Sequence, residues 1–367
     1  MMTRFVFDRR QAILGMGAAL MMSAAKQAVA ADGDFAARLA EMQRDGRVSG
    51  LDALLVSRRG RLLFEYYGEG EAENWGVPLG KVKFGPTVLH DLRSVSKSLV
   101  GMLYGIALAE GKVPPPEAGL YEQFPEYADL AKQPGRERIT IAHVLSMTMG
   151  LEWDELTHPY GDPRNSENRM AAAPDRYRYI LSLPIVEAPG VKWIYFGGAT
   201  ELLGCLIAKG TGQTLQDYAR HALFDPLGLG PVEWSTDAKG EPRAASGGRM
   251  RPSDLLRVGQ MVLSNGAWQG KQIVPADWLK RSTTPAVTIE GARRYGWHWY
   301  LGELSVGTPR HVEPTISAIG WGGQRLFLVP ALDLAVAMNA GNYRLPIMEQ
   351  GRIGTALILD LVLPALS

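Results

Sequence analysis

Segments with the apolar pattern of β-strands lie near both ends of this 367-residue chain. Near the start, two strands are expected to form a hairpin at residues 51–57 and 61–67. Near the end, strands are expected at residues 295–301, 315–319, 325–329 and 334–340. The stretch between them shows helical periodicity at residues 140–149, 176–183, 199–209 and 214–224. This distribution favours one antiparallel sheet built from both ends of the chain, with helices on its faces and a helical lobe inserted.

The chain is therefore assigned to the α+β class, as a single catalytic unit of two lobes. A sheet-and-helix lobe is expected to comprise residues 31–95 and 240–367, and a mostly helical lobe residues 96–239. Further helices are expected at residues 35–44, 253–264 and 353–363. Connecting loops, which would shape any pocket, are expected at residues 69–87, 152–175 and 284–294.

The N-terminus has the pattern of an export signal. Arg4, Arg9 and Arg10 precede an apolar run at residues 12–22, and Ala28-Val29-Ala30 provides a cleavage site. The adjacent arginines favour a twin-arginine signal peptide over residues 1–30, with an ordinary secretory signal as the alternative. The apolar run is too short to span a bilayer stably. The mature protein is expected to be periplasmic or secreted, without a stable membrane anchor.

Charge and metal-ligand spacing exclude several classes of function. The 39 basic and 38 acidic residues nearly cancel, which argues against a nucleic-acid partner or an anionic membrane surface. The six histidines and the single cysteine show no metal-ligand spacing, so neither a metal nor another cofactor is expected. The cysteine, Cys205, lies in an apolar run and is expected to be a buried small hydrophobe.

A serine and a lysine three residues apart, Ser94 and Lys97, begin a largely apolar run that ends at Ala109. On a helix, residues at i and i+3 share a face, so the hydroxyl and the amine can meet. A buried amine favours its neutral form and could then accept the serine proton. The free N–H groups of a helix N-terminus could stabilise an oxyanion. The spacing is compatible with a nucleophile and its base.

The motif alone is weak, because two fixed residues in four occur by chance. Ser23 and Lys26 form a second copy, but it lies in the expected signal peptide and would be removed. A serine that begins a helix is also commonly only an N-cap. An α/β-hydrolase would need G-x-S-x-G at a strand-to-helix turn, and Ser246, which comes nearest, has Ala244 where the first glycine belongs.

Several segments, in the same order, resemble the serine β-lactamase-like hydrolases. The likeness is greatest to the group that contains class C β-lactamases, carboxylesterases and 6-aminohexanoate-dimer hydrolases. It extends over about residues 50–345, with the segments RSVSKS (93–98), ITIAHVLSMTMGL (139–151), PG (189–190), YFGGATELLG (195–204), FDPLGL (224–229) and GWGGQ (320–324). The resemblance implies a β-lactamase/DD-peptidase-like fold with Ser94 as nucleophile. It also implies that the phenol of Tyr195 lies beside Ser94 and Lys97. Whether Lys97 or Tyr195 is the base in the resting state is left open.

Two departures from the family pattern concern the substrate. The family's Lys-Thr-Gly segment is replaced by Trp321, Gly322 and Gly323, and an indole cannot hold a substrate carboxylate as a lysine does. The resemblance implies that the backbone N–H of Gln324 completes the oxyanion hole with that of Ser94, while the two glycines would let the substrate lie close to the strand. Gly197 replaces an asparagine that usually contacts the substrate amide, although the glycine pair could simply form a tight turn.

These observations favour a serine hydrolase that acts through an acyl-enzyme, with small carboxylic esters as the first substrate candidates. A 6-aminohexanoate-dimer-type amide hydrolase and a weak β-lactamase or D-amino-acid peptidase are the alternatives within the family. A non-catalytic domain that binds an acyl ligand or a peptidoglycan fragment is the alternative from another class. The sequence does not determine the oligomeric state.

Overall fold

The computed structural model describes residues 35–306 and 311–366, and they form two compact units. The expected signal peptide at residues 1–30 lies outside the described residues. Of the described residues, the smaller unit comprises 35–49 and 355–366. In it, a helix at residues 35–44 buries Phe35, Leu39 and Met42 at helical spacing, and Arg47 forms an ion pair with Asp360. The larger unit, Gly50–Gly354, contains the candidate site.

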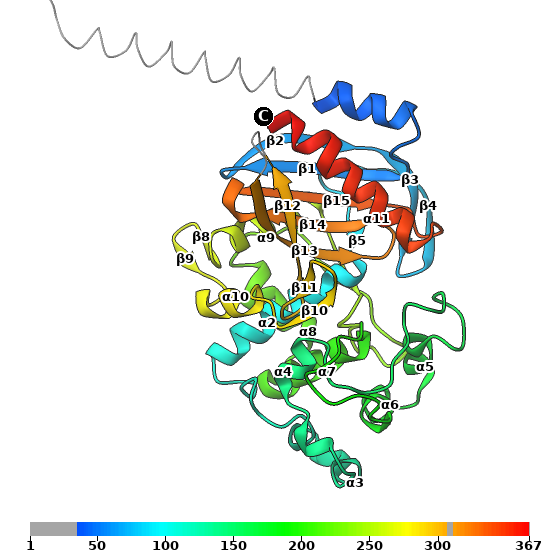
Figure 1. Ribbon diagram of the computed structural model, residues 1–367, viewed down its shortest axis with the longest axis vertical. Helices are drawn as coiled ribbons and strands as arrows, with labels where there is room; N and C mark the ends of the chain where they lie inside the picture. The colour runs from blue at the N-terminus through cyan, green and yellow to red at the C-terminus, as the bar shows by residue number, and fades with distance from the viewer. Residues whose placement is uncertain (1–34, 307–310, 367) are drawn as a thin grey trace, which may run out of the picture. The chain divides into compact units, whose positions relative to one another are not determined.

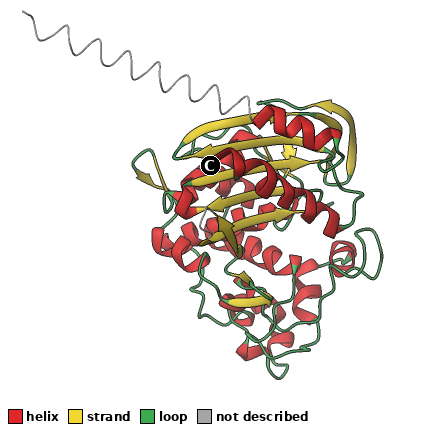
Figure 2. Ribbon diagram, turned by 45° about the horizontal axis from the view of Figure 1, so that its top comes forward, coloured by secondary structure: helices red, strands yellow, loops and turns green. Residues whose placement is uncertain are grey.

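The larger unit contains an eight-stranded antiparallel sheet. Figures 1 and 2 show its strands side by side, with helices packed around them. Its strand order is β10-β11-β12-β13-β14-β15-β1-β2. The strands are β1 (Leu51–Arg58), β2 (Arg61–Tyr67), β10 (Val287–Glu290), β11 (Arg293–Tyr295), β12 (Tyr300–Val306), β13 (His311–Gly320), β14 (Gln324–Val329) and β15 (Leu334–Ala340). Strand β1 pairs with β2 on one side and with β15 on the other. The prediction of an antiparallel sheet built from both ends of the chain is confirmed.

Helices cover the sheet and form a group beyond it. Helix α9 packs on β1, β14 and β15, and α2 contacts β13 as well as the helices α7 and α10. In Figure 1, the green helices α4 to α7 form a group below the sheet. The α-helices are α2 (Ser96–Ala109), α3 (Ala128–Ala131), α4 (Ile141–Leu145), α5 (Ser166–Ala172), α6 (Arg176–Ser182), α7 (Gly197–Thr211), α8 (Leu215–Ala219), α9 (Pro252–Leu263), α10 (Ala276–Ser282) and α11 (Ile347–Ala356). These positions confirm the α+β assignment.

Short elements complete the chain. Three small sheets pair β3 (Glu69–Asn74) with β4 (Val77–Lys83), β5 (His90–Asp91) and β6 (Glu233–Trp234) with β7 (Gly248–Met250), and β8 (Ala267–Trp268) with β9 (Lys271–Gln272). Six short 3₁₀-helices are η1 (Arg93–Val95), η2 (Tyr121–Gln123), η3 (Pro125–Tyr127), η4 (Arg136–Arg138), η6 (Pro330–Leu332) and η8 (Pro364–Leu366) among the described residues. Two short π-helical segments are η5 (Arg220–Phe224) and η7 (Leu357–Val362).

The prediction of loops at residues 69–87 and 284–294 was wrong. The first segment forms the β3–β4 hairpin, and the second contains β10 and β11. The β3–β4 hairpin closes through Trp75 and Gly76, which both have positive φ, as hairpin turns of this kind require. Its strands carry cross-strand charges, such as Lys81 against Glu69, instead of alternating apolar residues. The alternation of apolar and polar residues that predicts a half-buried strand is therefore missing from this hairpin.

One hydrophobic core joins the sheet to the helices of the larger unit. It includes Leu55 of β1 and Leu328 of β14, together with Leu99 of α2 and Leu202 of α7. The two predicted lobes thus share a core that includes residues along most of α2, the helix that carries Lys97. Cys205 is half-buried on α7. In the described part of the chain, no helix combines the length and apolar character needed to cross a bilayer.

Candidate active site

Ser94 lies where a short strand ends and the central helix begins. Strand β5 leads into η1, which contains Ser94, and α2 follows directly. Lys97 lies in the first turn of α2, and its side chain is only 3% exposed. Its Nζ donates to Oγ of Ser94 at 3.0 Å. The i, i+3 spacing places the amine next to the hydroxyl, as the sequence predicts.

Tyr195 reaches the same hydroxyl from the helical part of the chain. It directly precedes Phe196, the N-cap of α7, and its phenol donates to Oγ of Ser94 at 2.6 Å. Nζ of Lys97 lies 5.0 Å from the centre of the Tyr195 ring. The structure thus brings Ser94, Lys97 and Tyr195 together. An amine and a phenol within reach of one hydroxyl can move a proton to and from it.

An aromatic cluster surrounds the Tyr195 side chain. Tyr195, Met147 and Tyr295 form a buried group, against which Trp193 and Tyr300 pack. Burial raises the pKa of Tyr195 well above the ordinary value of about 10, and the negative charge of Glu155 raises it further. The phenol is therefore protonated at neutral pH, so it can donate a proton in the resting site.

Glu155 is a buried carboxylate that the sequence did not indicate. Its Oε2 accepts hydrogen bonds from the backbone N–H of Gly197 at 2.7 Å and from Nε1 of Trp153 at 2.9 Å. Its Oε1 accepts from the Tyr160 hydroxyl at 3.1 Å. A Cβ atom on Gly197 would lie 2.8 Å from Oε2, so a larger residue would force this carboxylate to move away from the backbone N–H that it binds. Glu155 lies in an irregular segment about 40 residues before Gly197, and no local pattern links the two positions.

A second buried carboxylate supports Lys97 indirectly. Nζ of Lys97 also donates to the carbonyl of Ala245 at 3.1 Å. The N–H of Ala245 donates to Glu201 on α7 at 2.9 Å, and Arg176 donates to the other oxygen of Glu201 at 2.8 Å. Glu201 is 3% exposed. A glutamate in the apolar run 199–207 was the one sequence signal for this role, because a buried carboxylate needs partners.

The predicted substrate-binding segment turns sharply between β13 and β14. Gly322 and Gly323 have φ values of +88° and +99°, which other residues adopt only with strain. The space above them is filled, since added Cβ atoms would lie 2.5 Å from the Tyr343 ring and 3.0 Å from Cβ of Ala340. The turn therefore accounts for both glycines. That they also let a substrate lie close to the strand stays a prediction.

The side chains of Trp321 and Gln324 both make contacts within the protein. Gln324 is fully buried, and its amide donates to the Ala340 carbonyl at 2.6 Å. The half-buried Trp321 contacts Tyr160 edge to face, with ring centres 5.3 Å apart. The turn itself lies beside the nucleophile, because a Cβ atom on Gly320 would lie 2.3 Å from the Leu92 carbonyl. The oxyanion role of the Gln324 N–H stays a prediction.

A charged cavity of about 260 Å³ lies next to this group of residues. Its walls include Ser246, which follows the Ala245 carbonyl that binds Lys97, and the buried Glu167. Burial raises the pKa of Glu167 to about 8, and the nearby Glu155 contributes to the rise. Arg176, Glu201 and Arg243 also line the cavity. Within residues 35–306 and 311–366, no group of three or more His, Cys, Asp or Glu side chains is placed to hold a metal ion.

Comparison with known proteins identifies related sequences and folds. The family described as "Beta-lactamase" matches residues 35–344. The 6-aminohexanoate-dimer hydrolase of Paenarthrobacter ureafaciens is 26% identical over 324 residues, which cover 82% of this chain and 75% of that protein. The "Beta-lactamase" of Escherichia coli K12 is 24% identical over 227 residues, or 60% of this chain and 56% of that protein.

Solved structures share the fold at low sequence identity. The hydrolase EstCE1, described as having promiscuous acyltransferase activity, superposes with a TM-score of 0.66 at 17% identity, over 88% of this chain and 99% of the other. A class C β-lactamase superposes with a TM-score of 0.64 at 18% identity, over 91% and 99%. The predicted β-lactamase/DD-peptidase-like fold is confirmed.

Proposed function

Because the chain belongs to the Beta-lactamase family and has the fold of its hydrolases, we propose that it is a serine hydrolase with Ser94 as its nucleophile. The observation that carries the proposal is the meeting of an amine and a phenol at the hydroxyl oxygen of Ser94. Oγ of Ser94 lies 3.0 Å from Nζ of Lys97 and 2.6 Å from the phenol oxygen of Tyr195. Each group comes from the segment in which the family resemblance predicts it.

The geometry suggests how the reaction would proceed. Oγ of Ser94 attacks the substrate carbonyl carbon, and Lys97 in its neutral form accepts the serine proton. Lys97 is the preferred acceptor because the raised pKa of Tyr195 keeps the phenol protonated. The tetrahedral intermediate collapses as the leaving group takes a proton through Tyr195, which Lys97 reprotonates. Water then attacks the acyl carbon and gives a proton to Lys97. The bond between that carbon and Oγ breaks, Oγ of Ser94 takes the proton back from Lys97, and the carboxylic acid leaves. The N–H groups of Ser94 and Gln324 are the proposed oxyanion donors.

Small carboxylic esters are the proposed first substrates. The position that holds a lysine in β-lactamases holds Trp321 here, and Trp321 packs against Tyr160. Gly197, in place of an amide-binding asparagine, lies against the carboxylate of Glu155. Neither change affects the three groups at Ser94. An ester needs less assistance to its leaving group than an amide does, so it can react where these contacts are missing.

An amide hydrolase acting on a dimer of 6-aminohexanoate is the second candidate. Two observations favour it: the 26% identity with the enzyme of that name over 82% of the chain, and the charged cavity beside Ser246. That dimer has an amine at one end and a carboxylate at the other. Arg243 in the cavity wall offers a partner to the carboxylate.

A side-by-side assay distinguishes these candidates. The wild-type protein and Ser94→Ala would be given p-nitrophenyl acetate and butyrate, nitrocefin, and the 6-aminohexanoate dimer. Ester turnover that disappears in Ser94→Ala supports the proposal, whereas faster turnover of the dimer favours the amide hydrolase. A fluorophosphonate probe followed by peptide mass mapping should label Ser94, and a label at another residue would overturn the assignment. A stable acyl adduct without turnover would instead indicate a binding protein.

We also propose that residues 1–30 direct export to the periplasm, on the strength of the paired arginines Arg9 and Arg10 and the Ala28-Val29-Ala30 site. Fractionation of cells that express the full chain tests this proposal. Replacement of both arginines by lysine should leave the protein in the cytoplasm, and unchanged export would point to an ordinary secretory signal.

A further inference from the structure

Arg93, the residue directly before Ser94, has a left-handed backbone. Its φ is +49°, a conformation that is unfavourable for any residue with a Cβ atom. Non-glycine residues remain in this region only where their surroundings hold them there. The backbone is confined on one side, because a Cβ atom on Gly320 would lie 3.2 Å from Cβ of Arg93.

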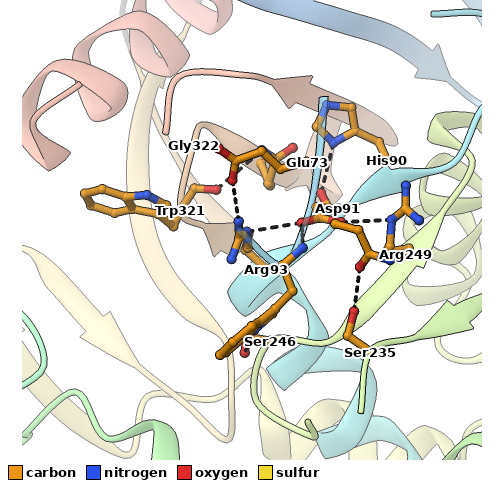
Figure 3. Close-up of polar contacts among 12 residues, drawn as sticks. Glu73, His90, Asp91, Arg93, Ser235, Ser246, Arg249, Trp321 and Gly322 are labelled. Carbon is orange, nitrogen blue, oxygen red and sulfur yellow. Dashed lines mark hydrogen bonds and ion pairs between the residues drawn. The ribbon is translucent and has the colours of Figure 1, made fainter. Parts of the chain in front are cut away.

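The Arg93 side chain is held by two carboxylates and an aromatic ring. Its guanidinium donates to Glu73 at 2.9 Å and forms an ion pair with Asp91 at 3.3 Å. It also lies over the Tyr343 ring, 5.0 Å from the centre. Figure 3 shows Arg93 between Glu73 and Asp91, with Trp321 and Gly322 beside it. The side chain is only 14% exposed, so these contacts are largely protected from water and are stronger than a surface ion pair.

Asp91 connects this group to two further elements. It is 3% exposed, its Oδ2 accepts the backbone N–H of Trp75 at 2.7 Å, and its Oδ1 lies 2.9 Å from Nε of Arg249 on β7. Arg249 in turn pairs with Glu233 on β6 at 2.8 Å. Glu73 and Trp75 belong to the β3–β4 hairpin and its turn. The charged cluster therefore fixes the hairpin to the strand that leads into Ser94.

We propose that Arg93 is a positioning residue for the nucleophile, and that Glu73 and Asp91 hold it in its left-handed conformation. The proposal rests on Ser94 being the nucleophile. The backbone angles of Arg93 set the direction of both the N–H and the side chain of Ser94, because rotation there swings the whole of the next residue. A displacement of about 1 Å in a reacting group can lower a rate about 100-fold. The β3–β4 hairpin thus acts on the site through the contact of Glu73 with Arg93.

Four variants separate this role from that of an ordinary ion pair. Arg93→Ala keeps the unfavourable backbone and removes the anchor, and kcat for p-nitrophenyl butyrate should fall 10- to 100-fold with KM little changed. Arg93→Gly also lacks the anchor, but glycine adopts positive φ freely, so it should recover at least about fivefold over Arg93→Ala. Glu73→Gln should lower kcat several-fold. Glu71→Gln, at an exposed position of the same strand, is the matched control and should match the wild type.

The outcomes distinguish the two proposals. If Arg93→Ala and Glu73→Gln lose thermal stability but keep the wild-type kcat at a temperature where they are folded, the cluster is only structural and the inference is wrong. Equal kcat values for Arg93→Ala and Arg93→Gly would also contradict it, because the backbone conformation would then be irrelevant. If the wild-type protein shows no turnover and the fluorophosphonate does not label Ser94, the proposed function itself fails.

Discussion

The phenol oxygen of Tyr195 lies 2.6 Å from Oγ of Ser94, although 101 positions separate the two residues in the chain. Replacement of Tyr195 by phenylalanine keeps the ring in its aromatic cluster and removes only the hydroxyl. General acid–base groups contribute about 10²- to 10⁴-fold to rates, so we expect a loss in kcat of that size for p-nitrophenyl esters. Tyr67→Phe, on the edge strand β2, is the control and should be fully active. An active Tyr195→Phe would mean that Lys97 suffices as the proton carrier.

The charge of Glu155 should be visible in the pH dependence of hydrolysis. Burial and this carboxylate raise the pKa of Tyr195 well above 10, so the wild type should show no alkaline loss due to Tyr195 below about pH 10. Glu155→Gln retains a hydrogen-bonding side chain and removes the charge. The pKa of Tyr195 should then fall, and the alkaline limb of the kcat profile should move to lower pH.

The control for that profile is Glu152→Gln, an exposed position three residues away. Other titratable groups face or surround Tyr195: Lys97, Glu167, Tyr160, Tyr295 and Tyr300. Both variants leave these groups in place. Identical profiles for Glu155→Gln and the wild type would show that Glu155 only holds the backbone of Gly197.

Gly197 should not tolerate even one methyl group. The Cβ atom of Gly197→Ala would lie 2.8 Å from Oε2 of Glu155, which must then move and lose its bond to the N–H. Overpacking of this kind typically costs about 1–3 kcal/mol. We expect a loss of that size in the free energy of unfolding of Gly197→Ala, to be measured by urea denaturation. Gly351→Ala in α11 is the opposite control, since nothing lies within 4 Å of its added Cβ. It should be neutral or stabilising by up to about 1 kcal/mol.

Glu167 should make the protein less stable as the pH rises. Its pKa is raised from 4.5 to about 8 in the folded state, so between these values the folded state retains a proton that the unfolded state releases. Stability therefore falls as pH rises through this window and levels off above about pH 8. Glu167→Gln removes the effect. We expect the variant to gain at least about 1 kcal/mol over the wild type between pH 5 and pH 8, while exposed Glu137→Gln should follow the wild type.

The parts of the site that could be predicted are those marked by a local sequence pattern or by the family resemblance. The i, i+3 spacing placed Lys97 beside Ser94, and the resemblance placed Tyr195 with them. Both expectations match the observed geometry. The sheet was predictable because its central strands β1, β14 and β15 are buried along most of their length, which gives apolar runs with clear ends.

The rest depends on contacts between distant polar residues. Glu155 meets Gly197, Glu201 meets Ala245, and Glu73 meets Arg93, and none of these pairs leaves a periodic trace in the sequence. The β3–β4 hairpin was missed for a related reason, since its strands are stabilised by charges and a tight turn rather than by burial. A positive φ at an arginine cannot be read from its residue type either, because only the folded surroundings hold it there.

The pairing of β1 with β15 has a consequence for how the protein is made. Leu54 of β1 is opposite Met338 of β15, so the first strand of the sheet in chain order pairs with the last. At the usual synthesis rate of about 5–20 residues per second, β15 emerges from the ribosome roughly 15 s or more after β1. During that time β1 can pair only with β2, and its other edge is open to strands of neighbouring chains. A nascent chain of this design needs protection at that edge until its synthesis is nearly complete.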